Sequence, residues 1–530
     1  MAHPSTTRLP NEILVLIFSH FCLHCQDAYN ESWDERPLRP IASQRKEQQA
    51  EAKPWYSIDR QTLCSLSLTC RQFRDIAQPV LYHEFVLGYG DSWISEVYQW
   101  DDRLAPFIRT LARRPDLALL VKVIYISHRI FCTSEDKDEP RRNVLLEAAN
   151  ALGVDLPAAW KERVEIWDYI CLWKKFDWPD VYPVFSEFYL DDHRRLTEKQ
   201  ERQLRRAMSE KSMPGRRWMN AELIAMLLAH TPNIEIISIQ SSRGWPTCGI
   251  AESSMPALGV THLPVKRLDL GMPAHPIVKI SDNLETLNFH GYIGNLGYIK
   301  MEMPSLKSLR ITEGFLSAVR LSKVLEGCTG GLVAFEYEAA QGRRQNNDQT
   351  PAVNFQLSDA IELLRLHKST LQILHLDLTA RRVDIRRIEP GVNMRDFTAL
   401  QHLWINTLLL FPIVLPPILG TPADAEILVQ FLPRSIVSLE IYRDGRCFVS
   451  DALHGLVAVK SEQFPFLKWV ILGPRGGGDL GRVSKAAGVS FSTKVYRLCQ
   501  VKTYLQGPNT DSRLEFPDWD SDDELWYGEE

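Results

Sequence analysis

The sequence predicts an α/β chain in which a short helical module precedes an irregular solenoid, with parallel strands inside and helices outside. Two observations support this: two apolar segments with helical spacing near the N-terminus, and a short apolar pattern that recurs through the second half. The chain has 530 residues, of which 45% are hydrophobic and 24% charged, a composition typical of soluble globular proteins. We expect four regions: a helical module at 1–85, a helical and early repeat region at 86–230, the solenoid at 231–506, and an acidic tail at 507–530.

The N-terminal module contains two apolar segments, at 9–21 and 63–82. In the first, Pro10 occupies a first-turn position, where a proline is tolerated because the N–H group there is unpaired anyway. Apolar side chains then recur every three or four residues, which predicts a helix. Residues 24–62, between the segments, are polar and hold few aliphatics, so we expect a flexible insertion there. Two such short segments cannot form a self-sufficient core, so they must pack on the rest of the chain, on a partner, or on both.

The recurring pattern has six residues, Φ-x-x-Φ-x-Φ, and its last two apolar positions alternate as in a strand. It begins at Ile234, Val265, Leu284, Leu306, Leu332, Leu371, Leu400, Ile436 and Leu467, with an early copy at Val121. Segments with helical spacing lie between some copies, as at 316–326 and 358–366. One strand and one helix cannot bury each other fully, but stacked copies can, so the pattern predicts a solenoid. An ordinary doubly wound α/β domain is the alternative, because it also alternates strands and helices.

The N-terminal segments resemble an F-box of the fungal type. The first matches its opening helix as Leu9-Pro10-x-x-Ile13-Leu14-x-x-Ile17-Phe18, and the second matches its later half, where Leu66 and Leu68 precede Cys70-Arg71-x-Phe73. The resemblance implies that the module binds a Skp-family adaptor and, through it, a cullin. The adaptor-binding residues that it implies are Leu9, Pro10, Ile13, Leu14, Ile17, Phe18, Leu66 and Phe73.

The repeats resemble a degenerate leucine-rich-repeat array, which many F-box proteins carry. The spacing is irregular and the asparagine expected after each strand is absent, so the usual ladder of loop hydrogen bonds should be missing. The combined resemblance implies a non-catalytic substrate-recognition subunit of an SCF-type ubiquitin ligase, with a protein substrate. A non-degradative scaffold, and an α/β enzyme that uses a glycine-rich loop, are the alternatives.

The face of the strands that points away from the helices should line the concave side of the solenoid, where such proteins often bind extended partners. The pattern places these side chains there: Arg267, Asp269, Thr286, Asn288, Ser308, Arg310, Glu336, Ile373, His375, His402, Trp404, Ser438, Glu440, Trp469 and Ile471. Exposed Trp404 and Trp469 beside Arg310 would form an anchor for a substrate; alternatively, loops or the C-terminal tail cover these tryptophans. As substrate-binding candidates we select Arg310, Glu336, His375, His402, Trp404, Glu440 and Trp469.

Two motifs could indicate a cofactor or a metal, and we interpret neither that way. Gly476 to Gly481 matches G-x-G-x-x-G, but no acidic residue follows about 20 positions later, as a dinucleotide site requires. Cysteines and histidines at the N-terminus could surround zinc: Cys22, His24, Cys25, Cys64 and Cys70. Cys-x-His-Cys at a helix end is poor ligand spacing, so we interpret the cysteines as small buried thiols and expect neither metal nor cofactor.

Charge and hydropathy restrict the remaining partners. The net charge of −5 carries no basic excess, so we expect no nucleic acid. The most apolar run, 407–420, is too short for a membrane span and holds three prolines. The cysteines are scattered and no signal peptide precedes them, which indicates reduced thiols in the cytoplasm or the nucleus.

Overall fold

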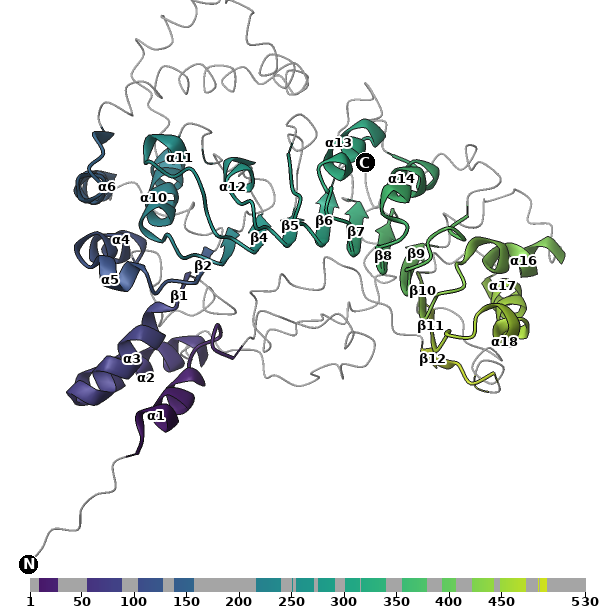
Figure 1. Cartoon of the computed structure of the whole chain (residues 1–530), viewed down its shortest axis with the longest axis horizontal. Coiled ribbons are helices and arrows are strands. Elements are labelled where there is room, and N and C mark those ends of the chain that lie inside the picture. The colour runs from purple at the N-terminus through teal and green to yellow at the C-terminus, as the bar shows by residue number, and fades with distance from the viewer. Residues whose placement is uncertain are drawn as a thin grey trace, which may run out of the picture.

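The computed structural model contains one parallel sheet of twelve strands, and the order of the strands in the sheet is their order in the sequence. Figure 1 shows the sheet as a curved band, with the helices that connect its strands on the outer side. The structure describes residues 9–26, 55–87, 103–126, 138–156, 216–239, 250, 254–270, 275–290, 301–314, 316–339, 355–378, 393–406, 422–442, 449–472, 485 and 487–492. The acidic tail and the loop at 476–481 lie outside these residues.

The strands are short, as the repeating pattern predicts. They are β1 Glu84–Leu87, β2 Val123–Ile126, β3 Ile236–Ile239, β4 Arg267–Leu270, β5 Thr286–His290, β6 Ser308–Gly314, β7 Ala334–Ala339, β8 Ile373–Asp377, β9 His402–Asn406, β10 Ser438–Tyr442, β11 Trp469–Leu472 and β12 Ser490–Ser492. Every copy of the pattern found in the sequence, from Val121 onward, is one of these strands. The prediction of one parallel sheet assembled from repeats is therefore confirmed.

The helices divide into an N-terminal group and a group that connects the strands. The first group is α1 Asn11–Ser19, α2 Trp55–Thr69 and α3 Arg71–Tyr82. The second is α4 Leu104–Arg113, α5 Pro115–Ala118, α6 Asp138–Ala151, α10 Arg216–His230, α11 Ser254–Ala257, α12 His275–Lys279, α13 Ala318–Glu326, α14 Leu357–Leu364 with the 3₁₀ turn η7 Arg365–His367, α16 Pro422–Phe431, α17 Val449–Ala458 and α18 Lys460–Gln463. The helices expected at 316–326 and 358–366 are α13 and α14.

The strand order excludes the doubly wound alternative. Each strand pairs with the strands before and after it in the sequence, so the order never reverses. The two apolar positions of each strand, such as Leu268 and Leu270, point toward the helices and join one continuous core. In register, Leu268 is beside Leu287, which is beside Leu309 on the next strand. Stacking of identical positions therefore builds this core one repeat at a time.

A pair of main-chain hydrogen bonds recurs at the start of strands β2 to β11. The carbonyl of Glu235 accepts hydrogen bonds from Lys266 N and Arg267 N, at 2.9 and 3.1 Å, and the carbonyl of Lys266 accepts from Glu285 N and Thr286 N. The same arrangement recurs from His83, just before β1, to Val437, just before β10. One carbonyl thus accepts hydrogen bonds from two backbone donors of the next strand's start.

Two strands were not predicted from the sequence. The first, β1, matches the pattern at Tyr82, Phe85 and Leu87, but we assigned Tyr82 to the preceding helical segment alone. The last, β12, lacks the pattern, and it joins the sheet by pairing Phe491 with Val470 of β11. Strand β1 connects the N-terminal module directly to the solenoid.

The N-terminal module packs around its own small core, formed by Leu14, Phe18, Cys22, Leu63, Ala77 and Val80. Cys70 ends α2 and caps α3, because its sulfur accepts a hydrogen bond from Phe73 N at 3.4 Å. Gln72 on α3 donates to Asn11 on α1 at 2.8 Å. The expected flexible insertion at 24–62 is wrong at its end, because residues 55–62 form the first half of α2.

No helix among the described residues combines the length and the apolar character that a membrane span needs.

Candidate protein-interaction site

Helix α1 divides its apolar side chains between the module's core and the solvent. Leu14 and Phe18 are buried against α2 and α3, whereas Ile13 and Ile17 are 42% and 41% exposed, and Leu9, just before the helix, is 52% exposed. Leu14 and Phe18 were expected to contact an adaptor, and their burial makes them unavailable to a partner. The helical period explains both results, because consecutive residues are about 100° apart around a helix, so Ile13 and Ile17 lie on a face beside that of Leu14 and Phe18.

Most of the large apolar side chains exposed in the described part of the chain belong to this module. They are Leu9, Ile13, Val15, Leu16, Ile17, Ile58 and Leu68. Pro10 is also exposed, while Leu66 and Phe73 are half-buried against the core, Phe73 lying edge-on to Phe18 at 5.4 Å. Scattered exposed apolar residues are ordinary, but such a concentration on one small module is typical of an interaction surface.

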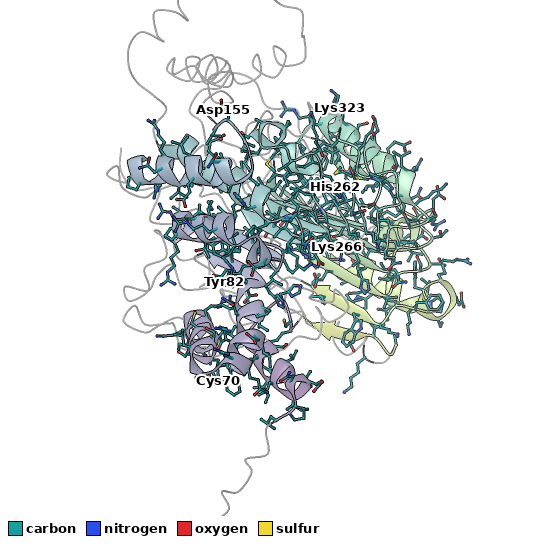
Figure 2. All side chains as sticks on the ribbon, turned by 60° about the vertical axis from the view of Figure 1, so that its left-hand side comes forward. Cys70, Tyr82, Asp155, His262, Lys266 and Lys323 are labelled. Atoms are coloured by element: carbon teal, nitrogen blue, oxygen red, sulfur yellow. The ribbon has the colours of Figure 1, made fainter. Side chains whose placement is uncertain are left out.

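The module is attached to the solenoid at one end of α3. Tyr82 stacks on Phe107 of α4 with ring centroids 6.0 Å apart, and Phe85 of β1 stacks on the same ring at 4.0 Å. Cys70, at the other end of α3, lies far from the sheet, as Figure 2 shows. The module therefore joins the solenoid where α3 leads into β1 and packs on α4.

On the face of the sheet opposite the helices, polar side chains form one row in register. From β3 to β10 the row contains Ser238, Asp269, Asn288, Arg310, Glu336, His375, Trp404 and Glu440. The sequence predicts seven of these residues, all except Ser238, on the face opposite the helices, and the strand registers confirm that prediction. All except Glu440 are buried.

Of the two alternatives for Trp404, exposed or covered, the structure shows it buried, since only 4% of it is accessible. Its indole stacks on the imidazole of His375, with centroids 4.0 Å apart and planes 6° from parallel. Arg310 and Glu336 form an ion pair at 2.6 Å, with side chains 5% and 1% exposed. These four candidates are buried side chains, whereas Trp469, the other tryptophan of the strip, is half-buried.

Three substrate-binding candidates remain partly accessible: His402, Glu440 and Trp469 are half-buried. They occupy adjacent strands, with His402 beside Ser438 and Ser438 beside Trp469. Because neighbouring strands lie about 4.8 Å apart, these side chains border one stretch of the face near its C-terminal end. Among the substrate-binding candidates, these three are the ones that keep partial access to solvent.

Asp269 is a buried carboxyl in the middle of the polar row. Burial raises its pKa to about 6, although Ser238, which donates a hydrogen bond at 3.0 Å, and the positive charge of Arg310 act in the opposite direction. A group with such a pKa changes charge near neutral pH. The charge of Asp269 in this row therefore depends on pH in the range around 6.

The cysteines do not all follow the expectation of small buried thiols. Cys64 and Cys70 are exposed, whereas Cys22 and Cys25 gather with His24 and with His83, which the sequence analysis did not consider. The hydrogen bond from Cys22 and the interaction with His83 lower the pKa of Cys25, and the same Cys22–Cys25 contact and burial raise the pKa of Cys22.

No protein-family model matches the chain, and no curated protein shows significant sequence similarity to it.

Proposed function

We propose that this chain is a substrate-recognition subunit of an SCF-type ubiquitin ligase. In this proposal the helices α1 to α3 bind a Skp-family adaptor, which links the chain to a cullin, and the solenoid binds a protein substrate. The observation that supports it best is the exposed apolar surface at α1, formed by Leu9 just before the helix and by Ile13 and Ile17 on it. A helix fixed to its module on one side and apolar on the other is suited to packing against a partner.

The apolar surface that α1 leaves in water could be buried by a partner. Complete burial of a large aliphatic side chain is worth about 1.5–3 kcal/mol, and each of these side chains is about half exposed. Covering each one should therefore contribute roughly 1 kcal/mol, before the cost of association. Several such residues on one helix are needed for stable binding, and α1 supplies them.

The solenoid would act by holding the substrate close to the conjugating enzyme. A substrate held on the sheet near His402, Glu440 and Trp469 would present its lysines to the conjugating enzyme at a high effective concentration. The chain itself would contribute binding and orientation, and the covalent step would take place elsewhere in the complex.

The test of adaptor binding is Ile13→Asp/Ile17→Asp in the full chain, followed by co-purification with the Skp adaptor and the cullin. Both positions are exposed, so the module should keep its fold while adaptor capture falls at least tenfold. Val319→Asp/Phe466→Asp is the matched control, because it changes two exposed apolar residues on the solenoid. Equal adaptor capture by the wild type and Ile13→Asp/Ile17→Asp would refute the proposal.

Leu14→Asp is not a suitable test of the interface, because it buries a charge in the module's own core. For the substrate surface, Trp469→Ala should reduce the set of co-purifying proteins identified by mass spectrometry while adaptor and cullin remain bound. An unchanged set of proteins would remove this stretch of the sheet from the proposed function.

A further inference from the structure

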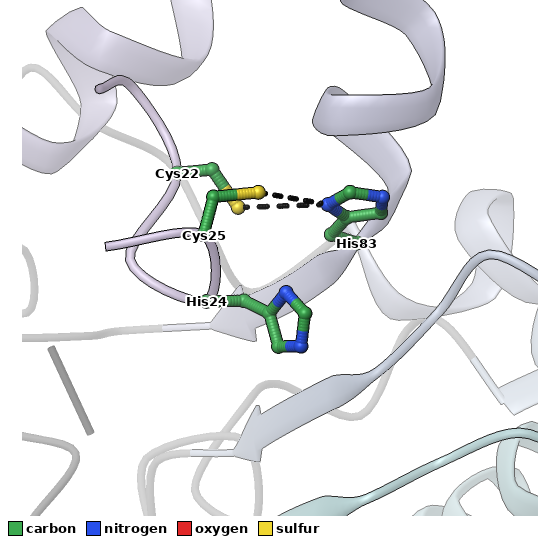
Figure 3. A group of neighbouring side chains, drawn as sticks. All are labelled: Cys22, His24, Cys25 and His83. Atoms are coloured by element: carbon green, nitrogen blue, oxygen red, sulfur yellow. Dashed lines mark hydrogen bonds between the residues drawn. The ribbon is translucent and has the colours of Figure 1, made fainter. Parts of the chain in front are cut away.

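A cluster of two cysteines and two histidines connects the N-terminal module to the first strand of the sheet. Cys22, His24 and Cys25 lie on the turn that follows α1, and His83 lies between α3 and β1. One ligand atom from each of the four residues lies within 4.8 Å of the others. Figure 3 shows both sulfurs directed at the His83 ring, with His24 on the same turn.

The individual contacts converge on one nitrogen. The Nδ1 atom of His83 lies 3.2 Å from the Cys25 sulfur and 4.0 Å from the Cys22 sulfur. The ring of His24 lies edge-on to that of His83, with centroids 5.4 Å apart, and its Nδ1 atom is buried with no hydrogen-bond partner. A buried imidazole nitrogen without a partner is costly unless something binds it, which indicates an incomplete site.

The Glu84 carboxylate fixes the backbone of the turn that contains Cys22, His24 and Cys25. This carboxylate accepts hydrogen bonds from Leu23 N at 3.4 Å and His24 N at 3.2 Å, and Arg60 binds the same carboxylate at 3.0 Å. The Glu84 side chain is fully buried. Two backbone donors of the Cys22–Cys25 turn are thus fixed by a charged group that is itself neutralised, so the sulfurs are held in position before any ligand arrives.

We propose that Cys22, His24, Cys25 and His83 bind one Zn²⁺ ion in a tetrahedral site. Two thiolates and two imidazoles are a ligand set that zinc prefers, with Zn–S and Zn–N bonds of about 2.3 and 2.0 Å. Tetrahedral geometry at these lengths separates the ligand atoms by roughly 3.3–3.8 Å. The ligand atoms are now up to 4.8 Å apart. Side-chain rotations that move each atom by about 1 Å would bring them to the tetrahedral separations. On binding, the Cys22 proton leaves to solvent, because a coordinated thiol is deprotonated.

The site would act as a clip between two parts of the chain. Its ligands come from the end of α1 and from the junction of α3 with β1, which are separated in sequence by α2 and by the segment before it. A metal bond across such a long loop restricts the unfolded chain and stabilises the packing of α1 on α3. This role depends on neither an adaptor nor a substrate, so the proposal is independent of the proposed function.

The experiment measures zinc in the full chain purified under reducing conditions. We expect about one Zn²⁺ per chain by elemental analysis, reduced at least fivefold in Cys22→Ser/Cys25→Ser. The matched control is Cys64→Ser/Cys70→Ser, which removes two exposed thiols from the same module and should retain the metal. A strong chelator should lower the melting temperature of the wild type and of this control equally.

A second measurement does not require the double variant to fold. Titration of the metal-free full chain with Co²⁺ should produce the visible bands of a tetrahedral ion and a thiolate-to-cobalt charge-transfer band, saturating at one equivalent. His83→Ala and His24→Ala should each change the visible bands and weaken binding at least tenfold. Absence of bound zinc and of the cobalt spectrum in the wild type would overturn the proposal. Unchanged spectra in both histidine variants would overturn the assignment of the ligands.

Discussion

The buried carboxyl of Asp269 should make the stability of the solenoid depend on pH, and Asp269→Asn should remove that dependence. Asp269 lies in β4 between Ser238 and Asn288 of the neighbouring strands, with only 2% of the residue accessible. Asparagine has nearly the same shape and carries no charge, and its carbonyl can still accept the hydrogen bond from the Ser238 hydroxyl. The substitution therefore changes charge with little change in packing.

The size of the effect follows from the pKa of this carboxyl, which burial raises to about 6 from an ordinary 3.8. The folded chain binds the proton more tightly than the unfolded chain. The favourable contribution is therefore complete below about pH 3.8, and it is lost as the pH rises through about 6. At 1.36 kcal/mol per pH unit, the full loss is about 3 kcal/mol.

The assay is urea denaturation of the full chain at several pH values between 4 and 8, followed by circular dichroism. The free energy of unfolding of Asp269→Asn minus that of the wild type should increase by about 3 kcal/mol across this range, with most of the change between pH 4 and 6. Asp75→Asn controls for the loss of one negative charge, because the Asp75 side chain is 70% exposed. A difference that stays constant with pH, or one that decreases, would refute the argument from burial.

Three further predictions concern the solenoid. Arg310→Met should destabilise it by about 3–5 kcal/mol because the buried Glu336 carboxylate loses its ion pair, and Arg310→Met/Glu336→Leu should recover most of that loss in chemical denaturation. Leu403→Asp should unfold the neighbouring repeats and lower the melting temperature sharply, whereas His402→Asp, one residue earlier on the opposite face, should be tolerated; equal losses would mean that the strand register is wrong. Gly455→Ala should cost about 1–3 kcal/mol by thermal denaturation, because its new methyl group would lie 2.0 Å from the Ala425 carbonyl oxygen of α16; an unchanged melting temperature would contradict this close packing.

The sequence alone predicts most of the sheet, because a strand's apolar alternation is a local property. Every copy of the apolar pattern became a strand, and the segments with helical spacing became α13 and α14. The pattern also predicts which residues face the helices: Leu268 does, and Asp269 does not. Cys70 before α3 was likewise visible as part of a motif, although its role as the cap of that helix was not.

Only the tertiary structure shows which of these side chains are accessible. Trp404 lies on the predicted face but is buried against His375, because burial depends on what packs over a position and not on the strand itself. Leu14 and Ile17 have the same apolar character, and only the packing of α1 on α2 and α3 separates one as core from the other as surface.

The cluster of cysteines and histidines shows the same limit most clearly. Cys22 and Cys25 suggest half of a metal site, but His83 is distant from them in sequence and becomes their neighbour only when α3 leads into β1. Strand β12 joins the sheet for a similar reason, since it has an existing edge, β11, to pair with. Local periodicity determines the repeating elements of this protein, whereas contacts between distant segments decide its surfaces and its candidate metal site.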